Sequence, residues 1–225
     1  MSPKPEAHIS LTLTLSTPTL SLSHPDEPLT IKVTATTLSS SKPAVGIIVN
    51  ARWTILDDRL TAYRYPLRLR SVREPESFIP LSPAVRISGA RPPVELDLRR
   101  SEMERFLVVP GMRRGGVEVE QKVTVGRIFE YSGMKPSDIQ PGSEYRFEVP
   151  NGSLPPQWWT FKDEAEGKRF AEGILPDENG FHGLKADDPA EVERLYREGW
   201  LYSYPIRDCK FTVETEPGAV VRFVE

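Results

Sequence analysis

Hydrophobic and polar residues alternate one by one through two long stretches near the start of the chain. Residues 9–15 place isoleucine or leucine at every second position, with serine and threonine between them. Residues 29–35 repeat the pattern with four aliphatic residues separated by threonine and lysine. A period of two residues predicts strands that bury one face and expose the other. A shorter alternation at Leu20 and Leu22 predicts a third strand, followed by a turn at HPDEP, residues 24–28.

The next strand is expected to differ, because its apolar residues are nearly continuous. Residues 44–56, AVGIIVNARWTIL, predict a central strand that is covered on both faces, with Trp53 in the core. Residues 57–110 are less regular, and short alternations there predict brief strands between proline-rich loops. These strands are expected at Leu67/Leu69, at Val85/Ile87 and at Val94/Leu96/Leu98.

Short strands are also expected around and after the glycine-rich turn PGMRRGG, residues 110–116. The expected segments are Val117/Val119, Val123/Val125 and an extended RIFEYSG at 127–133. The chain closes with two predicted strands, at 206–214 and 219–224, and the first places Cys209, Phe211 and Val213 on one face.

Two segments late in the chain interrupt the β pattern and predict short helices. Residues 162–174 carry acidic side chains in what would be a first helical turn. Residues 187–200 give a stronger signal, since Asp188 suits the N-cap and Pro189 the first helical position. Gly199 is expected to end this helix.

The stretch DIQPGSEYRFEV, residues 138–149, predicts a turn at Pro141-Gly142 and then a strand with Tyr145, Phe147 and Val149 on one face. Its spacing is similar to the tyrosine corner of immunoglobulin-like and fibronectin type III domains. The resemblance implies that the Tyr145 hydroxyl bonds back to upstream backbone and closes the corner. Many short strands with turn signals between them favour an all-β sandwich or barrel.

Composition limits where such a protein works. Its 225 residues are enough to bury a core, and its 22 prolines, about twice the usual share of roughly 5%, favour turns and edges over long helices. Cys209 is the only cysteine, so no intrachain disulfide forms. The chain starts without the apolar core of a signal peptide and contains no long apolar span. These features predict a cytoplasmic protein with no membrane association.

Charge is unevenly distributed along the chain. Residues 52–114 contain 13 arginines, no lysine and 8 acidic residues, whereas residues 115–225 contain 13 basic and 21 acidic residues. One interpretation is that the arginine-rich middle pairs with the acidic C-terminal part inside one fold. The other is an anionic partner, because guanidinium groups bind carboxylates well. Nucleic acid is not expected, since no basic run is interleaved with aromatic residues.

Four pieces of the sequence together resemble a group of uncharacterised proteins from filamentous fungi. The pieces are ISLTLTLSTPTLSLSHPDEPLTIKVTATTL at 9–38, GMRRGGVEVE at 111–120, IQPGSEYRFEV at 139–149 and QWWTF at 157–161. They cover roughly a third of the chain. The resemblance implies a cytoplasmic sandwich fold and contributes no catalytic residue.

Aromatic residues are the first candidates for a binding site. Trp158 and Trp159 follow two prolines, and adjacent residues of a strand point to opposite faces, so one is expected in the core and the other along a groove. A second cluster contains Trp200 and Tyr202. If the two clusters meet, they would wall an apolar pocket. The alternative is that they only pack the late helices onto the sheets.

The turn GMRRGG is the candidate for an anion site. Its glycines allow backbone N–H groups to form a concave nest, and Arg113 and Arg114 add positive charge. The alternative is a hairpin tip with solvated arginines. No metal site is expected, because the three histidines lie at no ligand spacing from one another or from Cys209. No cofactor is expected, because the sequence contains no phosphate loop and no GxGxxG after a strand. Cys209 is expected to be a buried thiol rather than a nucleophile.

The sequence therefore predicts a single mainly β domain over residues 1–225, an immunoglobulin-like or arrestin-like antiparallel β-sandwich. One or two short helices are inserted late, within a helical and aromatic excursion at about 155–204. The expected function is a non-enzymatic binding or scaffolding module with a protein partner, and a homodimer is compatible with it. The alternative is a protein that binds a hydrophobic metabolite or carbohydrate in the aromatic pocket, as a carrier or as a cofactor-free enzyme.

Overall fold

The computed structural model describes residues 4–51, 54–56, 67–81, 94–96, 106–149, 159–166, 169–172, 190, 193–194, 197–201, 208–214 and 219–225. For residues 94–96, Tyr131, 169–172 and 200–201 it describes the backbone alone. This part of the chain is mainly β, and its strands form four sheets. None of its helices is long and apolar enough to cross a membrane.

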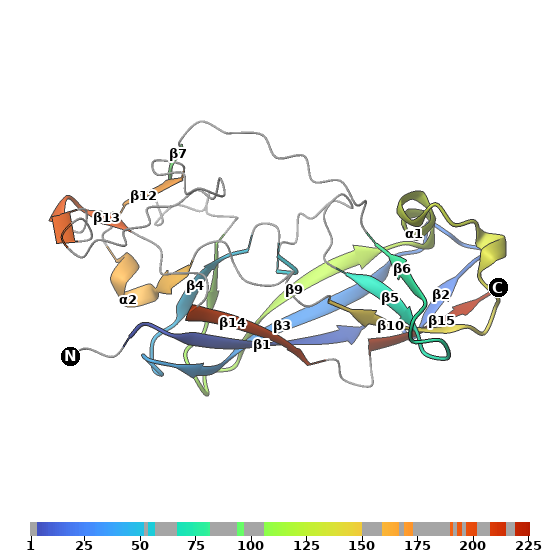
Figure 1. Cartoon of the computed structure of the whole chain (residues 1–225), viewed down its shortest axis with the longest axis horizontal. Helices are drawn as coiled ribbons and strands as arrows, with labels where there is room; N and C mark the ends of the chain where they lie inside the picture. The colour runs from blue at the N-terminus through green and yellow to red at the C-terminus, as the bar shows by residue number, and fades with distance from the viewer. Residues whose placement is uncertain are drawn as a thin grey trace.

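A four-stranded sheet runs along the length of the molecule (Figure 1). Its strands lie in the order β14 (Cys209–Glu214), β1 (Ala7–Leu15), β3 (Leu29–Ser40) and β9 (Gly116–Val123). The β1–β3 and β3–β9 pairs are antiparallel, whereas β14 lies parallel to β1. The alternation predicted for residues 9–15 and 29–35 is confirmed, since their aliphatic residues are buried, apart from half-buried Leu15.

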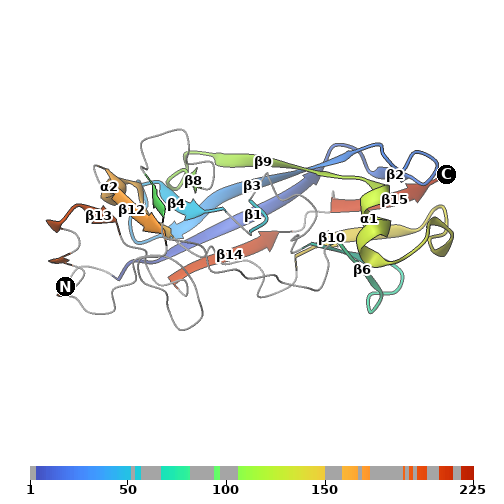
Figure 2. The ribbon, with the colours of Figure 1, turned by 90° about the horizontal axis from the view of Figure 1, so that it is seen from above.

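A five-stranded sheet lies at the end of the molecule that carries the C-terminus (Figures 1 and 2). Its order is β2 (Thr19–Ser21), β15 (Val220–Val224), β10 (Glu144–Glu148), β5 (Arg68–Ser71) and β6 (Phe78–Pro80). The chain enters β10 through the predicted turn, in which the Ser143 N–H donates to the Gln140 carbonyl at 3.0 Å and Gly142 has a φ of 87°. Glycine suits this position because it adopts positive φ without steric cost.

A three-stranded sheet lies near the opposite end and contains residues 47–50 of the apolar run predicted as a strand at 44–56, so the strand is shorter than expected. Its order is β11 (Trp159–Phe161), β4 (Ile47–Asn50) and β8 (Phe106–Val109). All four residues of β4 are buried and the strand is central, as predicted, while Trp53 lies outside the described residues. A further small sheet has the strand order β13 (Trp200–Leu201), β12 (Arg169–Glu172) and β7 (Val94–Leu96).

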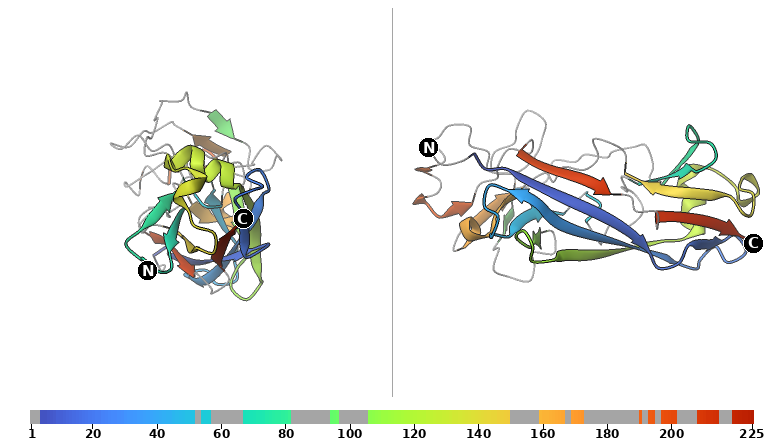
Figure 3. Two further views of the ribbon diagram at one scale, coloured as in Figure 1. Left: turned by 90° about the vertical axis from the view of Figure 1, so that its right-hand side faces the viewer. Right: turned by 90° about the horizontal axis from the view of Figure 1, so that it is seen from below.

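One hydrophobic cluster joins the four-, five- and three-stranded sheets. Its largest fully buried side chains include Trp159, Phe147, Phe161 and Phe223. The view from below shows the four-stranded sheet running along the molecule toward the end that carries the C-terminus, where β10 and β15 of the five-stranded sheet lie (Figure 3). Strands β5, β6 and β8 supply core residues, so parts of the irregular segment 57–110 belong to the main body.

The expectation of an extended segment at 127–133 is wrong, because helix α1 (Val125–Ser132) occupies it. The Thr124 side chain caps the helix by accepting a hydrogen bond from the Arg127 N–H at 3.2 Å. Gly133, with a φ of 70°, ends it and donates its N–H to the Phe129 carbonyl. Buried Val125 and Ile128 anchor one face of the helix in the core.

Two neighbouring expectations also need correction. The residues Val117, Val119 and Val123 belong to the single strand β9 rather than to two strands. The helix expected at 162–174 is short: α2 spans Lys162–Ala165, and residues 169–172 form β12.

The helix expected at 187–200 is only partly described. Ala190, Glu193, Arg194 and Arg197 are helical, and Gly199 follows with a φ of 83°. The two closing strands are confirmed as β14 and β15, and the pair Val85/Ile87 lies outside the described residues. A 3-10 turn, η1 (Pro136–Asp138), precedes the turn into β10.

Candidate functional site

Of the four aromatic residues predicted to wall a pocket, the structure describes the side chain of Trp159 alone. Trp159 begins β11 and is fully buried, with its ring edge-on to Phe161 at 5.4 Å between centroids. It is therefore the core member of the tryptophan pair. Trp158 and Tyr202 lie outside the described residues, and only the backbone of Trp200 in β13 is described. The aromatic pocket stays a prediction.

Arg113 and Arg114, the predicted anion site, lie exposed in the turn before β9. Arg113 has a φ of 63°, and Gly115 follows with 85°. The Met112 N–H donates to the Pro43 carbonyl at 2.7 Å, and the Arg114 N–H donates to the Gly111 carbonyl at 3.2 Å. Two backbone donors of this turn are thus already bound within the protein, which leaves fewer of them for an anion. Anion binding here stays a prediction.

Cys209 lies at the start of β14, and its side chain points into the core. Burial raises the pKa of its thiol to about 12. A thiol that stays protonated at neutral pH is a poor nucleophile. Among the described residues, no group of three or more His, Cys, Asp or Glu side chains is placed to hold a metal ion.

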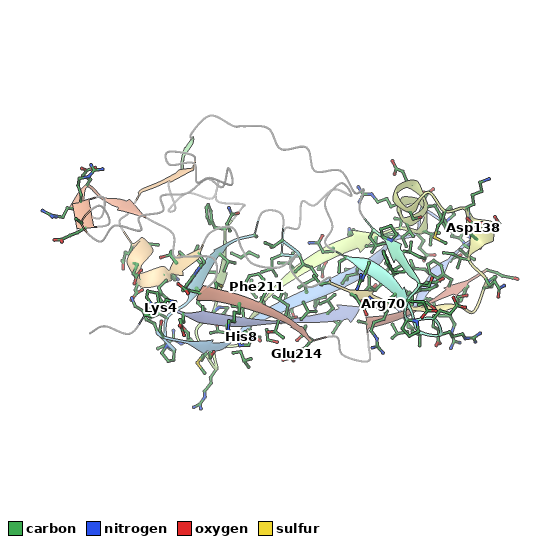
Figure 4. The ribbon with its side chains drawn as sticks, viewed as in Figure 1. Lys4, His8, Arg70, Asp138, Phe211 and Glu214 are labelled. Carbon is green, nitrogen blue, oxygen red and sulfur yellow. The ribbon has the colours of Figure 1, made fainter. Side chains whose placement is uncertain are left out.

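The outward side of the five-stranded sheet carries a cluster of arginines that the sequence did not single out. Strand alternation buries Leu69, Phe147 and Val221, so the residues between them point to solvent. These outward residues are Arg68, Arg70, Phe78, Glu144, Arg146, Glu148 and Arg222, and we call this surface the arginine face. Figure 4 labels Arg70 among the side chains of this sheet, at the end of the molecule away from Lys4.

Two glutamates neutralise part of the arginine face. Glu148 Oε2 accepts hydrogen bonds from Arg70 Nε at 2.7 Å and from Arg68 Nε at 3.2 Å. Partial burial opposes ionisation of Glu148, but the hydrogen bonds and charges of Arg70 and Arg68 outweigh it and hold its pKa below the ordinary value. Glu144 pairs in the same way with Arg222, whose Nε lies 3.1 Å from Oε1.

Arg146 differs from these arginines. It is exposed, and among the residues that the structure describes it forms no ion pair. In the antiparallel pairing of β10 with β5, Arg146 stands directly opposite Arg70. Like charges at directly opposed positions destabilise a sheet. The arginine face therefore has two like charges at directly opposed positions near its centre, and Glu148 offsets the charge of one of them, Arg70.

Apolar side chains lie beside these charges. Phe78, on edge strand β6, is 50% exposed and lies directly opposite Arg70 in the β5–β6 pairing. The Arg68 guanidinium stands over its ring at 5.1 Å. Val72, 41% exposed, follows β5 and donates its N–H to the Glu144 carbonyl at 3.0 Å. Exposed aromatic and arginine side chains together are typical of protein-binding surfaces.

The sequence predicted the outward residues of β10 but not the strand that lies beside it. It placed Tyr145, Phe147 and Val149 on one face of a strand, which leaves Glu144, Arg146 and Glu148 on the other. One of its two interpretations of the charge pattern paired arginines of the middle segment with acids of the C-terminal part, as Arg68 and Arg70 pair with Glu148. The missing information was that β10 lies beside β5. No family model matches this chain, and comparison with curated proteins and with solved structures finds no match either.

Proposed function

We propose that the protein is a non-enzymatic binding or scaffolding module that binds a protein partner through the arginine face. The observation that carries this proposal is the exposure of Phe78 beside Arg68 and Arg70 on one side of the five-stranded sheet. Aromatic and arginine side chains dominate the energetics of many protein interfaces because they bring large contact area and directed hydrogen bonds.

We also propose that the sheets form a sandwich of the immunoglobulin-like or arrestin-like kind. Support comes from the mostly antiparallel pairing and from the single core that the four- and five-stranded sheets share. The parallel pairs β1–β14 and β15–β2 are a departure from a purely antiparallel sandwich.

A matched pair of exposed residues makes the binding proposal testable. Phe78 and Leu38 are both 50% exposed, but Leu38 lies in β3 of the four-stranded sheet. A photo-crosslinking amino acid is placed at one position or the other, and partners are crosslinked in an extract of the source cells. A partner captured through position 78 but not through position 38 is then purified.

The affinity of that purified partner is measured by calorimetry for the parent protein, Phe78→Asp and Leu38→Asp. Phe78→Asp is expected to weaken binding by about tenfold or more, equivalent to about 1.4 kcal/mol, because it places a charge where the apolar contact forms. Leu38→Asp is expected to leave the affinity unchanged. Equal loss in both variants, or no partner that responds to Phe78→Asp, would refute the proposal.

A further inference from the structure

We propose that the segment bound by the arginine face is an acidic stretch of a protein partner, that Arg146 receives one of its carboxylates, and that Glu148 is an internal competitor that limits the affinity. This inference rests on the proposed function and adds the chemistry of the partner and the roles of two residues. Three features of the arginine face carry it.

The first feature is the opposition of Arg146 and Arg70 across β10 and β5. Arg70 gains the ion pair with Glu148, but its opposition to Arg146 gives the sheet no favourable contact, and a polar or acidic residue in place of Arg146 would remove the like charge. Violations of local rules of this kind are expected at functional or strained sites. A carboxylate supplied from outside would bridge the two guanidinium groups and turn the repulsion into attraction.

The second feature is the row of side chains that crosses the strands at this level. Val220, Arg146, Arg70 and Phe78 occupy adjacent positions on β15, β10, β5 and β6. Neighbouring strands are about 4.8 Å apart, so Arg146 and Phe78 are separated by roughly 10 Å, or about three residues of an extended chain. The row therefore fits a segment in the polyproline II conformation, which rises about 3.1 Å per residue with three residues per turn, so that a carboxylate and an apolar side chain three residues away point to the same side.

The third feature is the way Glu148 holds the neighbouring arginines. A single oxygen, Oε2, accepts hydrogen bonds from both Arg68 and Arg70. An incoming carboxylate must compete with this oxygen for the same donors. Removing the charge of Glu148 while keeping its shape would free the Nε donors of both guanidinium groups for the partner, whereas Arg70 Nη1 keeps its hydrogen bond to the Pro75 carbonyl.

The test uses a synthetic capped peptide of about ten residues, with glutamate at every third position and a leucine three positions after the last glutamate, matching the row. The comparison peptide has glutamine in place of every glutamate. Binding of fluorescent versions is measured by anisotropy at low and moderate salt. The acidic peptide is expected to bind about tenfold or more tightly than the glutamine peptide, with an advantage that shrinks as salt rises.

Variants then assign the roles. Arg146→Ala is expected to remove most of the advantage of the acidic peptide, whereas Arg114→Ala, at an exposed arginine before β9, is expected to retain it. Glu148→Gln is expected to strengthen binding of the acidic peptide severalfold. A charge reversal, Arg146→Glu, is expected to make the protein bind a peptide with lysine in place of glutamate more tightly than the acidic peptide. This gain of binding is measured without the Glu148→Gln variant and so does not depend on how that variant folds.

Three outcomes would overturn the inference: equal binding of the acidic and glutamine peptides, equal effects of Arg146→Ala and Arg114→Ala, or weaker peptide binding by Glu148→Gln. Arg146-dependent binding to anionic phospholipid vesicles without binding to the peptide would assign the surface to a membrane instead. If a partner depends on Phe78 but not on Arg146, the proposed function stands and this inference fails. If the peptide depends on Arg146 while no partner depends on Phe78, the proposed function fails.

Discussion

Tyr145 and Phe223 meet edge to face across β10 and β15, with ring centroids 5.5 Å apart and an angle of 89° between the rings. This contact ties the start of β10 to the last strand, next to the turn at Pro141-Gly142. The Gly142 N–H also donates to the Phe223 carbonyl at 2.7 Å. The Tyr145 hydroxyl donates no hydrogen bond to any residue that the structure describes, so the corner rests on ring packing and backbone bonds.

We therefore expect Tyr145→Phe to lower the free energy of unfolding by less than about 1 kcal/mol, because it keeps the ring and removes a hydroxyl without a described partner. A buried corner hydrogen bond would instead be worth about 1–3 kcal/mol. Tyr145→Ala, which also removes the ring contact, is expected to cost clearly more. Urea unfolding of the parent and the two variants measures these free energies of unfolding. Similar losses in Tyr145→Phe and Tyr145→Ala would indicate that the Tyr145 hydroxyl does form the corner hydrogen bond.

Arg146 is expected to lower the stability of the free protein. Arg146→Thr removes the repulsion with Arg70 and places a good strand former in β10, so we expect the free energy of unfolding to rise by ~0.2–1 kcal/mol. Arg222→Thr makes the same change of residue type on β15 but breaks a pair with Glu144, and we expect no gain there. Denaturant unfolding of both variants is the measurement, and a loss of stability in Arg146→Thr would contradict the repulsive pair.

Glu148 is expected to give the stability of the protein an acid-dependent part. The pKa of this carboxyl is held below its ordinary value of 4.5 in the folded state, where burial raises it but Arg70 and Arg68 lower it more. Its contribution is therefore fully present above the ordinary value and is lost as the pH falls through the lower folded value.

The parent protein should accordingly be more stable than Glu148→Gln at neutral pH, and this difference should shrink below about pH 4.5. Thermal unfolding across the acidic range, in one buffer of constant ionic strength, measures the difference. A difference that stays constant with pH would show that packing, and not charge, accounts for it.

Cys209 is expected to be unreactive in the folded protein. Its thiol is buried and its pKa is raised to about 12, so the thiolate that attacks a disulfide reagent is scarce at pH 8. Reaction with a chromogenic disulfide should be far slower in the native protein than in urea, and it should follow the unfolding transition. Rapid labelling of the native protein would show that the start of β14 opens readily.

The residue pattern predicted strands best where one face of the strand is buried and the other is exposed to solvent. Residues 9–15 and 29–35 became β1 and β3 because period-two alternation is a direct consequence of strand geometry. The turn at Pro141-Gly142 was equally predictable, since proline restricts φ at its position and glycine accepts the positive φ that follows. Both signals are local and need no knowledge of distant partners.

The error at 127–133 has a physical cause. The segment is rich in β-branched and aromatic residues, which favour strands, and it follows a valine run of the same kind. Helix signals were present in the capping Thr124 and in Gly133, with Val125 and Ile128 three apart. A helix of eight residues is marginal alone, and burial of its apolar face in the core decided the outcome.

By itself, the sequence determined that this is a mainly β protein, which residues of its long strands face inward, and that Cys209 and one of the two adjacent tryptophans would be buried. Only the tertiary structure decided that β10 lies beside β5, which brings Arg146 opposite Arg70 and both near Phe78. Strand neighbours far apart in sequence are chosen by packing of the whole core, and no local pattern encodes that choice.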